Sequence, residues 1–239
     1  MGTLKNTKLL VKSSMELPCS YIKGNIERRV NVSISYPHRE SKIVSDLTKN
    51  GFRRNYNHMY MPVCNNCSSC ISSRINIKKF VFSKNSRRNL KNNSDLILIK
   101  NKYQNKERFN LFKKYCQIRH SDGQMKDMSW NGFLDFFHNS TNQTEVYDLI
   151  DKDNRLYASI LLDVLEDGFS AVYSFFDPFL KRRGLGKNII LNVIQRLKKE
   201  NKSFLYLGYW VKESSRMNYK SSFNNIELFF DGNWIKKES

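Results

Sequence analysis

The order of elements in the second half of the chain constrains its fold more than any other feature of the sequence. Residues 145–178, EVYDLIDKDNRLYASILLDVLEDGFSAVYSFFDP, predict three consecutive antiparallel strands with turns at Asp-Asn and Asp167-Gly168. KRRGLGKNIILNVIQRLKKE then carries a glycine turn into an amphipathic helix, and SFLYLGYW reads as a buried strand. Strand, helix and strand in this order predict a crossover unit, so the expected fold class is α+β.

This order of elements resembles the core of the GNAT acyltransferases. In that fold the amides of the glycine turn, at the start of a helix, normally bind the pyrophosphate of coenzyme A. The matching glycines here are Gly184 and Gly186. A glycine pair at a helix start is also typical of a simple tight turn, so the pair alone does not predict a coenzyme A site.

The first half of the chain predicts shorter elements. Residues 30–34 alternate apolar and polar side chains, as a strand does, and a helix is expected from Pro37 to Asn50. A loop that carries cysteines leads to a short strand at residues 74–77. Ser83 is then placed to cap a basic helix.

A further helix is expected over residues 104–119, where Phe109, Phe112 and Tyr115 fall at helical spacing. We therefore expect an N-terminal cysteine-bearing α/β domain, residues 1–103, followed by a GNAT-like domain, residues 104–239.

The charge balance favours a polyanionic partner. The chain has 41 Lys and Arg against 22 Asp and Glu, a net charge of +19. Such a charge attracts nucleic acid, because each neutralised phosphate releases counterions. Frequent Lys, Asn and Ile also fit an AT-rich genome, which raises the Lys content without any such partner. No apolar run of about 18 residues and no secretion signal is present, so a cytoplasmic protein is expected.

Seven separated segments resemble, in the expected order, the bacterial aminoacyl-tRNA–protein transferases. These are the aspartate/glutamate leucyltransferases, which are related to the eukaryotic arginyltransferases. The segments are CSYIKGNIERRV, NGFRRNYNHMYMPVCNNCSSCISSRI, SKNSRRNLKNNSDL, YCQIRHSDGQM, DGFSAVYSFFDP, LYLGYWVKESSRMNYKSSF and DGNW. They extend from Cys19 to Trp234, nearly the whole chain.

The resemblance implies transfer of leucine from leucyl-tRNA to proteins that begin with Asp or Glu. The product would carry a degradation signal of the bacterial N-end rule pathway. A tRNA donor would explain the basic charge, and neither coenzyme A, DNA nor a membrane is then expected as a partner. An arginyl-tRNA donor, a coenzyme A-dependent N-acetyltransferase and a noncatalytic RNA-binding module remain the alternatives.

The cysteines are candidates for a metal site. Cys64, Cys67 and Cys70 are three residues apart, and Cys19 lies in the first matched segment. Four thiolates suit zinc or an iron–sulfur cluster. Eukaryotic relatives carry such a cluster at a different spacing, so the resemblance favours the cluster narrowly. Packing without a ligand is the alternative, and it is the expected role of Cys116.

The reaction needs a base for the acceptor's α-amine, and His120 with Asp122 is the candidate pair. The alternative for His120 is a polar helix terminus.

Recognition of an acidic side chain calls for arginine, whose planar fork matches a carboxylate. The candidates are Arg74, Arg87, Arg88 and Arg119, with Arg74 favoured because it follows the cysteine loop. The alternative for each is a solvated or phosphate-facing charge. Residues expected to stack on the terminal adenosine and to bind phosphate, with the core as their alternative, are Tyr209, Trp210, Asn218, Tyr219 and Lys220.

Overall fold

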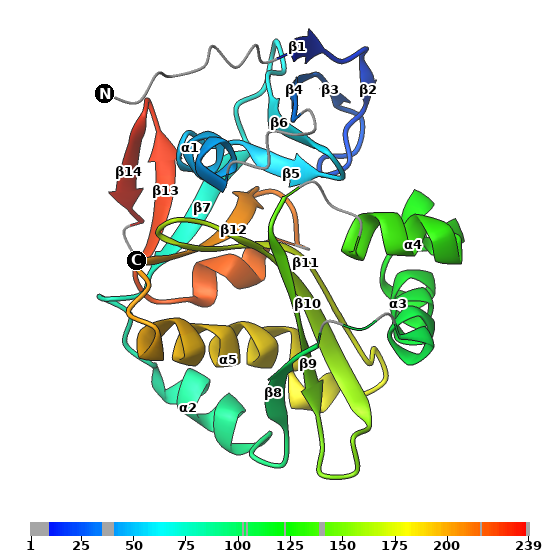
Figure 1. Cartoon of the computed structure of the whole chain (residues 1–239). Helices are drawn as coiled ribbons and strands as arrows, with labels where there is room; N and C mark the ends of the chain where they lie inside the picture. The colour runs from blue at the N-terminus through cyan, green and yellow to red at the C-terminus, as the bar shows by residue number, and fades with distance from the viewer. Residues whose placement is uncertain are drawn as a thin grey trace, which may run out of the picture.

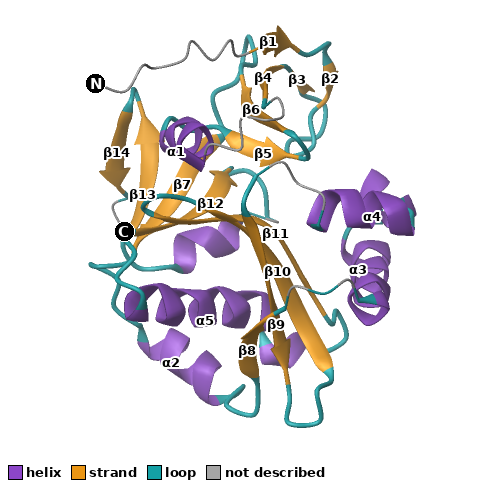
Figure 2. Cartoon of the chain, in the orientation of Figure 1, coloured by secondary structure: helices purple, strands orange, loops and turns teal. Residues whose placement is uncertain are grey.

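The computed structural model describes residues 10–34, 41–101, 103, 105–121, 123–138, 142–215 and 217–237. Its centre is an eight-stranded sheet with the strand order β14-β13-β7-β12-β11-β10-β9-β8. A smaller, four-stranded sheet of order β1-β4-β6-β5 lies above it in the view of Figure 1. The fold is α+β, as the sequence predicts, with helices on both faces of the large sheet (Figure 2).

The expected meander and crossover form the middle of the large sheet. The strands β9 (Thr144–Ile150), β10 (Leu156–Val164) and β11 (Gly168–Phe176) are antiparallel, and helix α5 (Leu185–Lys199) leads to β12 (Phe204–Trp210). Strand β12 pairs in parallel with β11. These elements confirm the prediction of a GNAT-like core.

Glycine permits the sharp approach into α5. Gly184 has a φ of +59°, a left-handed conformation that costs other residues about 1–2 kcal/mol. The short helix η2 (Lys181–Arg183) precedes it, and the side chain of Asn89 donates to the carbonyl oxygen of Arg183 at 3.1 Å. The apolar face of α5 is buried as expected, with Ile189, Val193 and Leu197 each at 0% exposure.

The two faces of the sheet are covered by different helices. Helix α5 packs on one face together with α2 (Lys84–Lys91), which Ser83 caps by accepting a bond from the amide of Ser86. On the opposite face, α3 (Lys106–Arg119) and α4 (Trp130–Phe137) form an aromatic cluster with β11. The short helix η1 (Gln124–Asp127) connects α3 with α4.

The N-terminal part of the chain lies on the same face as α3 and α4. Its sheet contains β1 (Leu10–Ser13), β4 (Arg29–Ser33), β5 (Arg53–Asn55) and β6 (His58–Pro62), and β2 (Leu17–Pro18) pairs separately with β3 (Ile26–Glu27). Helix α1 (Ser41–Lys49) packs beside it. Strand β4 and helix α1 confirm two predicted elements, whereas the predicted helix start at Pro37 lies outside the described residues.

The predicted domain boundary at residue 103 does not coincide with a boundary between the two sheets. The strands β7 (Ile71–Asn76) and β8 (Ile97–Lys100) come from the first half of the chain but belong to the large sheet, where β7 pairs with both β12 and β13 (Ile226–Phe230). The edge strand is β14 (Asn233–Lys236). The large sheet is therefore built from both halves of the chain.

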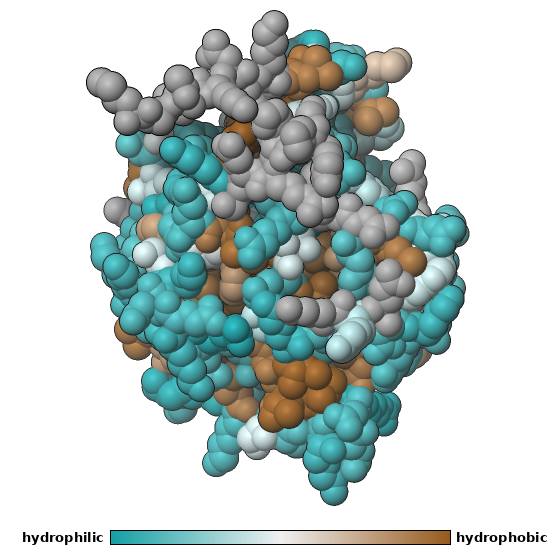
Figure 3. All heavy atoms as spheres, viewed as in Figure 1, coloured by the Kyte–Doolittle hydropathy of each residue, from teal (hydrophilic) through white to brown (hydrophobic). Residues whose placement is uncertain are grey.

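None of the helices among the described residues has the length and apolar content needed to cross a membrane. The face seen in Figure 3 is mostly hydrophilic, with smaller hydrophobic areas between polar ones.

Candidate active site

The parallel strands β11 and β12 separate part-way along their length. Their pairing extends from Gly168 and Phe204 to Ser170 and Tyr206. Beyond this point β11 follows its partner β10, whereas β12 follows β7 through an irregularity at Gly208. The separation leaves room for side chains between the two strands.

Arg53, from β5 of the smaller sheet, extends into this separation. The residue is 9% exposed. Its Nη1 donates to the Oγ of Ser170 at 2.9 Å, and its Nη2 donates to the carbonyl oxygen of Ala171 at 2.6 Å. A Cβ atom at Gly208 would lie 2.7 Å from the Nε of Arg53, so the guanidinium requires glycine at that position.

Lys220 is a second buried cation at the same place. It lies in the short helix η3 (Asn218–Ser222) and is 4% exposed. Its Nζ donates to the carbonyl oxygen of Tyr209 on β12. Burial lowers the pKa of Lys220 to about 7, and the charge of Arg53 adds to this effect, while Cys70 opposes it. No Asp or Glu in the described part of the chain forms an ion pair with Lys220 or Arg53.

Tyr219 and Tyr115 extend the site towards His120. Tyr219 is 43% exposed, and its phenol lies within electrostatic range of Arg53 and Tyr115. The Tyr115 ring, on α3, is 5.4 Å from the ring of His120. The site therefore includes one solvent-accessible aromatic residue next to the buried cations.

His120 is half-buried and follows the last residue of α3, where its amide donates to the carbonyl oxygen of Cys116 at 2.9 Å. This position fits the helix-terminus alternative and also places the imidazole beside Tyr115. Asp122 lies outside the described residues. The role of the pair as base and orienter stays a prediction.

Tyr209 belongs to the core. It is 4% exposed, and its hydroxyl lies 3.1 Å from the carbonyl oxygen of Gly51 and 3.0 Å from that of Tyr60. Burial raises the pKa of this phenol well above its usual range. Tyr209 thus joins the two sheets, as its alternative role predicts, and is not free to stack on a nucleotide.

Trp210 is half-buried, and Lys237 lies over its ring with the Nζ 5.6 Å from the centroid. The indole Nε1 is buried without a hydrogen-bond acceptor among the described residues. Trp210 therefore remains a candidate for substrate binding. The side chain of Asn218, predicted to lie with these residues, is outside the described ones.

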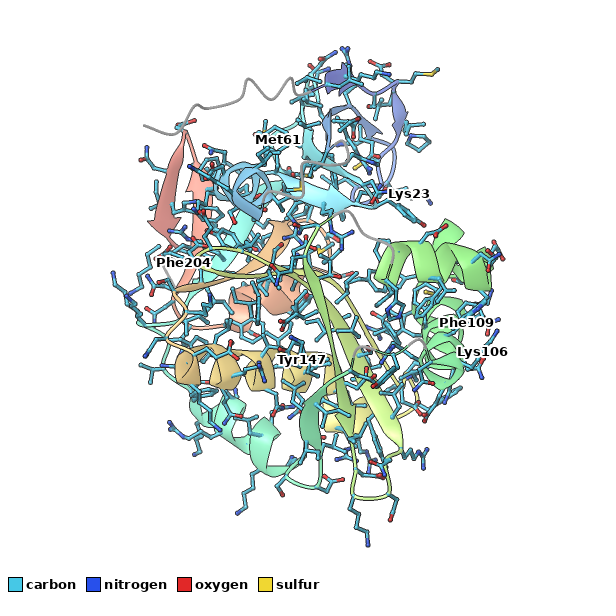
Figure 4. All side chains as sticks on the ribbon, in the orientation of Figure 1. Lys23, Met61, Lys106, Phe109, Tyr147 and Phe204 are labelled. Carbon is cyan, nitrogen blue, oxygen red and sulfur yellow. The ribbon has the colours of Figure 1, made fainter. Side chains whose placement is uncertain are left out.

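Arg74 has a carboxylate partner within the chain. Its Nε donates to the Oε2 of Glu227 at 2.8 Å, and the side chain is 13% exposed. The guanidinium lies 3.7 Å from the ring of Phe204, labelled in Figure 4, and 4.3 Å from the ring of Trp234. The favoured expectation for Arg74 is corrected here, because Glu227 takes the place that an acceptor carboxylate would need.

The remaining predicted arginines lie on the surface. Arg87 and Arg88 are exposed on α2, and Arg119 is exposed at the end of α3. Arg87 donates to the carbonyl oxygen of Phe82 at 2.6 Å. Their exposure agrees with a solvated or phosphate-facing role, and the structure does not bring them to Arg53 and Lys220.

The cysteines of the predicted metal site line one small cavity. Cys19, Cys64, Cys67 and Cys70 surround a volume of about 30 Å³. The Sγ of Cys19 accepts bonds from the amides of Tyr21 and Ile22, both at 3.4 Å. In the described residues, however, no three His, Cys, Asp or Glu side chains are already arranged as metal ligands.

The chemistry of the cavity fits a cation. Burial, together with the neighbouring thiols Cys19, Cys64 and Cys67, raises the pKa of Cys70 to about 12. All five cysteines are free, so no disulfide relieves this crowding. The Cys70 thiol, whose pKa is raised, would lose its proton most readily to a bound metal. Cys116 is buried elsewhere, near the hydroxyl of Tyr173 at 3.7 Å.

Arg53 and Gly208 were not among the residues that the sequence nominated. Both stand in matched segments, Arg53 in NGFRRNY and Gly208 in LYLGYW. The signal that could have singled them out is a glycine within a strand, which often marks a close approach of another group. The partner of that glycine is more than 150 positions away, and only the fold identifies it.

The meander, the crossover helix and the separated parallel strands define a GNAT-like acyltransferase fold. The crystal structure of FemX shares this fold, with a TM-score of 0.50 at 6% identity over 89% of this chain and 84% of that one. Profiles described as the N terminus and the C terminus of arginine-tRNA-protein transferase match residues 17–88 and 107–230. The chain belongs to the arginine-tRNA-protein transferase family.

Curated relatives align over nearly the whole chain. An aspartate/glutamate leucyltransferase of Granulibacter bethesdensis is 37% identical over 91% of this chain and 81% of its own length. The protein of the same name from Gluconacetobacter diazotrophicus is 34% identical over 94% of this chain and 86% of its own length. The chain is accordingly an enzyme that uses an aminoacyl-tRNA donor and a protein acceptor.

Proposed function

We propose that the chain transfers leucine from leucyl-tRNA to the N-terminal α-amine of proteins that begin with Asp or Glu. The observation that carries this proposal is the match, over 91% and 94% of this chain, to two proteins named aspartate/glutamate leucyltransferase. The product would be a degradation signal of the bacterial N-end rule pathway, made in the cytoplasm. The net charge of +19 supports a tRNA donor, because the acceptor stem is a polyanion.

The chemistry asks little of the protein beyond orientation. The α-amine attacks the carbonyl carbon of the leucyl ester, a C–N bond forms, and the C–O bond to the terminal ribose breaks. One amine proton ends on the ribose hydroxyl that leaves. A neutral fraction of the amine exists near neutral pH, since α-amines have a pKa of about 7.7–8.0. Holding the two substrates together therefore supplies much of the rate.

The residues around the separated strands suit these tasks. His120 is the proposed proton acceptor, and it lies beside Tyr115 and hence near Tyr219. Trp210 offers a buried indole N–H for the donor or the acceptor. Surface cations on α2, Arg87 and Arg88, are proposed to face donor phosphates.

We propose in addition that Cys19, Cys64, Cys67 and Cys70 hold an iron–sulfur cluster or a zinc ion. Their common cavity supports this assignment. A bound metal would stabilise a segment that contains little apolar surface of its own, since Asn65, Asn66, Ser68 and Ser69 separate the cysteines. It would also tie the arm that carries Cys19 to the start of β7.

A transfer assay with three donors tests the proposed function. Purified protein is incubated with leucyl-tRNA, arginyl-tRNA or acetyl-CoA and with peptides that begin with Asp, Glu or Ala. We expect transfer from leucyl-tRNA to the Asp and Glu peptides alone. Transfer from arginyl-tRNA in its place would support the alternative that the family description suggests.

A further inference from the structure

Two buried basic side chains lie in the separation between β11 and β12, and neither forms an ion pair with an Asp or Glu of the described residues; Asp163, which is paired with Arg54, lies within electrostatic range of Arg53. Arg53 and Lys220 are 9% and 4% exposed, and every hydrogen bond recorded for their side chains goes to a neutral oxygen, from Ser170, Ala171 or Tyr209. Their charges repel each other. Burial of an unpaired charge is costly, and a pair of like charges raises that cost.

The other buried arginines of this fold have acidic partners. Arg54, the next residue on β5, donates to Asp163 at 2.8 Å, and Arg108 donates to Asp148 at 2.6 Å. Arg74 is paired with Glu227. Arg53 and Arg54 are neighbours on β5, and both contact strands of the large sheet. Arg54 forms an ion pair there with Asp163, whereas the hydrogen bonds of Arg53 go to Ser170 and Ala171.

The geometry leaves donors available at Arg53. A guanidinium has five N–H groups, and two hydrogen bonds are recorded for this one. Gly208 packs closely against the edge formed by Nε and Nη2, since a Cβ there would lie 2.7 Å from Nε and 2.8 Å from Nη2. Tyr219, exposed to 43%, is the solvent-accessible residue within electrostatic range of this group.

We propose that Arg53 and Lys220 together bind the side-chain carboxylate of the acceptor's first residue. This assignment rests on the function proposed above and supplies the acidic specificity that Arg74 does not. A single small anion suits two buried cations better than a phosphate of the tRNA backbone, which carries bulky ribose on both sides. Because the carboxylate and the α-amine of an N-terminal Asp are only a few bonds apart, binding the first also positions the second.

The test measures peptide binding in the absence of tRNA. Two fluorescent peptides differ only in their first residue, Asp or Asn, which have nearly the same shape but differ in charge. We expect the wild-type protein to prefer the Asp peptide. Arg53→Gln and Lys220→Met should each weaken binding of the Asp peptide about 10- to 100-fold and leave the Asn peptide unchanged.

Further variants separate recognition from folding. Arg53→Lys keeps the positive charge but loses the planar guanidinium, so its loss of affinity for the Asp peptide should be intermediate. This variant tests the proposal if Arg53→Gln does not fold. Arg155→Ala removes an exposed arginine in the β9–β10 turn and should keep the wild-type preference. Affinity for leucyl-tRNA should be the same in all of these proteins.

Three results would overturn the assignment. One is an Asp-to-Asn preference that is unchanged in the Arg53 and Lys220 variants. The second is an equal loss for both peptides, which would indicate a structural role. The third is weaker leucyl-tRNA binding with a shallower dependence on salt, because a lost phosphate contact releases fewer counterions; this result would assign the cations to phosphate. If the protein prefers the Asp peptide but transfers no leucine, the proposed function is refuted and the carboxylate site is still supported.

Discussion

Replacement of Gly208 by alanine should displace the guanidinium of Arg53. Gly208 has a φ of +78°, and an alanine Cβ would lie 2.7 Å from Nε and 2.8 Å from Cζ. The left-handed conformation alone costs about 1–2 kcal/mol for a residue with a Cβ. Loss of one hydrogen bond from the charged guanidinium adds about 1.5–3 kcal/mol. The free energy of unfolding should therefore fall by about 2.5–5 kcal/mol in total.

Gly232 provides a matched control. Its φ is +79°, and a Cβ there would meet no atom within 4 Å. Gly232→Ala should thus show the conformational cost alone. For a chain of this size, 1 kcal/mol corresponds to about 2–4 °C in Tm, so Gly208→Ala should melt about 3–12 °C below Gly232→Ala.

Thermal unfolding and the Asp-peptide binding assay together read out both effects. Gly208→Ala should lose Asp-peptide affinity, whereas Gly232→Ala should keep it. In an Arg53→Ala background the clash has no partner, so Gly208→Ala should then cost only as much as Gly232→Ala. Equal melting temperatures and equal peptide affinities for the two single variants would refute the proposed contact.

Three other outcomes are expected. Asp163→Ala leaves Arg54 buried and unpaired, so it should lower the free energy of unfolding by about 3–5 kcal/mol in chemical denaturation. Asp46→Ala, which breaks an exposed ion pair with Lys49, should lower it by less than about 1 kcal/mol. Equal effects of the two substitutions would contradict the burial argument. Lys220 has a pKa of about 7 in the folded chain and 10.5 ordinarily, so the unfolded state binds the additional proton between these values and stability should rise with pH across that window. Lys220→Met should remove this rise in a pH series of melts, and an unchanged pH dependence would count against the lowered pKa of Lys220. Anaerobically purified protein should contain a metal, which the Cys19→Ala and Cys67→Ala variants should lose and the Cys116→Ala variant should keep. Visible absorbance that bleaches in air would identify an iron–sulfur cluster, and a colourless ion removed by chelators would identify zinc. Active protein without metal would show that the cysteines only pack.

Local patterns in the sequence predict the elements of the core. Asp167-Gly168 marks the turn between β10 and β11, and the apolar spacing of residues 189–197 gives the buried face of α5. Ser83 caps α2 as its type and position indicate. Each of these signals acts within a few residues, which is why the sequence alone suffices for them.

Contacts between distant segments are what the sequence does not reveal. The sequence predicts a domain boundary at residue 103, yet β7 pairs with β12 and β13, which lie in the second half of the chain. The sequence favours Arg74 for binding an acceptor carboxylate, but its partner in the structure is Glu227. Arg53 and Arg54 are indistinguishable as letters, and the fold gives an acidic partner to only one of them.

Leucyl transfer itself is the measurement that tests the account most directly. Radiolabelled leucyl-tRNA is supplied with a peptide that begins with Asp, and the same peptide is supplied in parallel with acetyl-CoA. The account predicts incorporation of leucine at the N-terminal amine, dependent on the acidic first residue, and no acetylation. Acetylation of the peptide without transfer from any charged tRNA would contradict it.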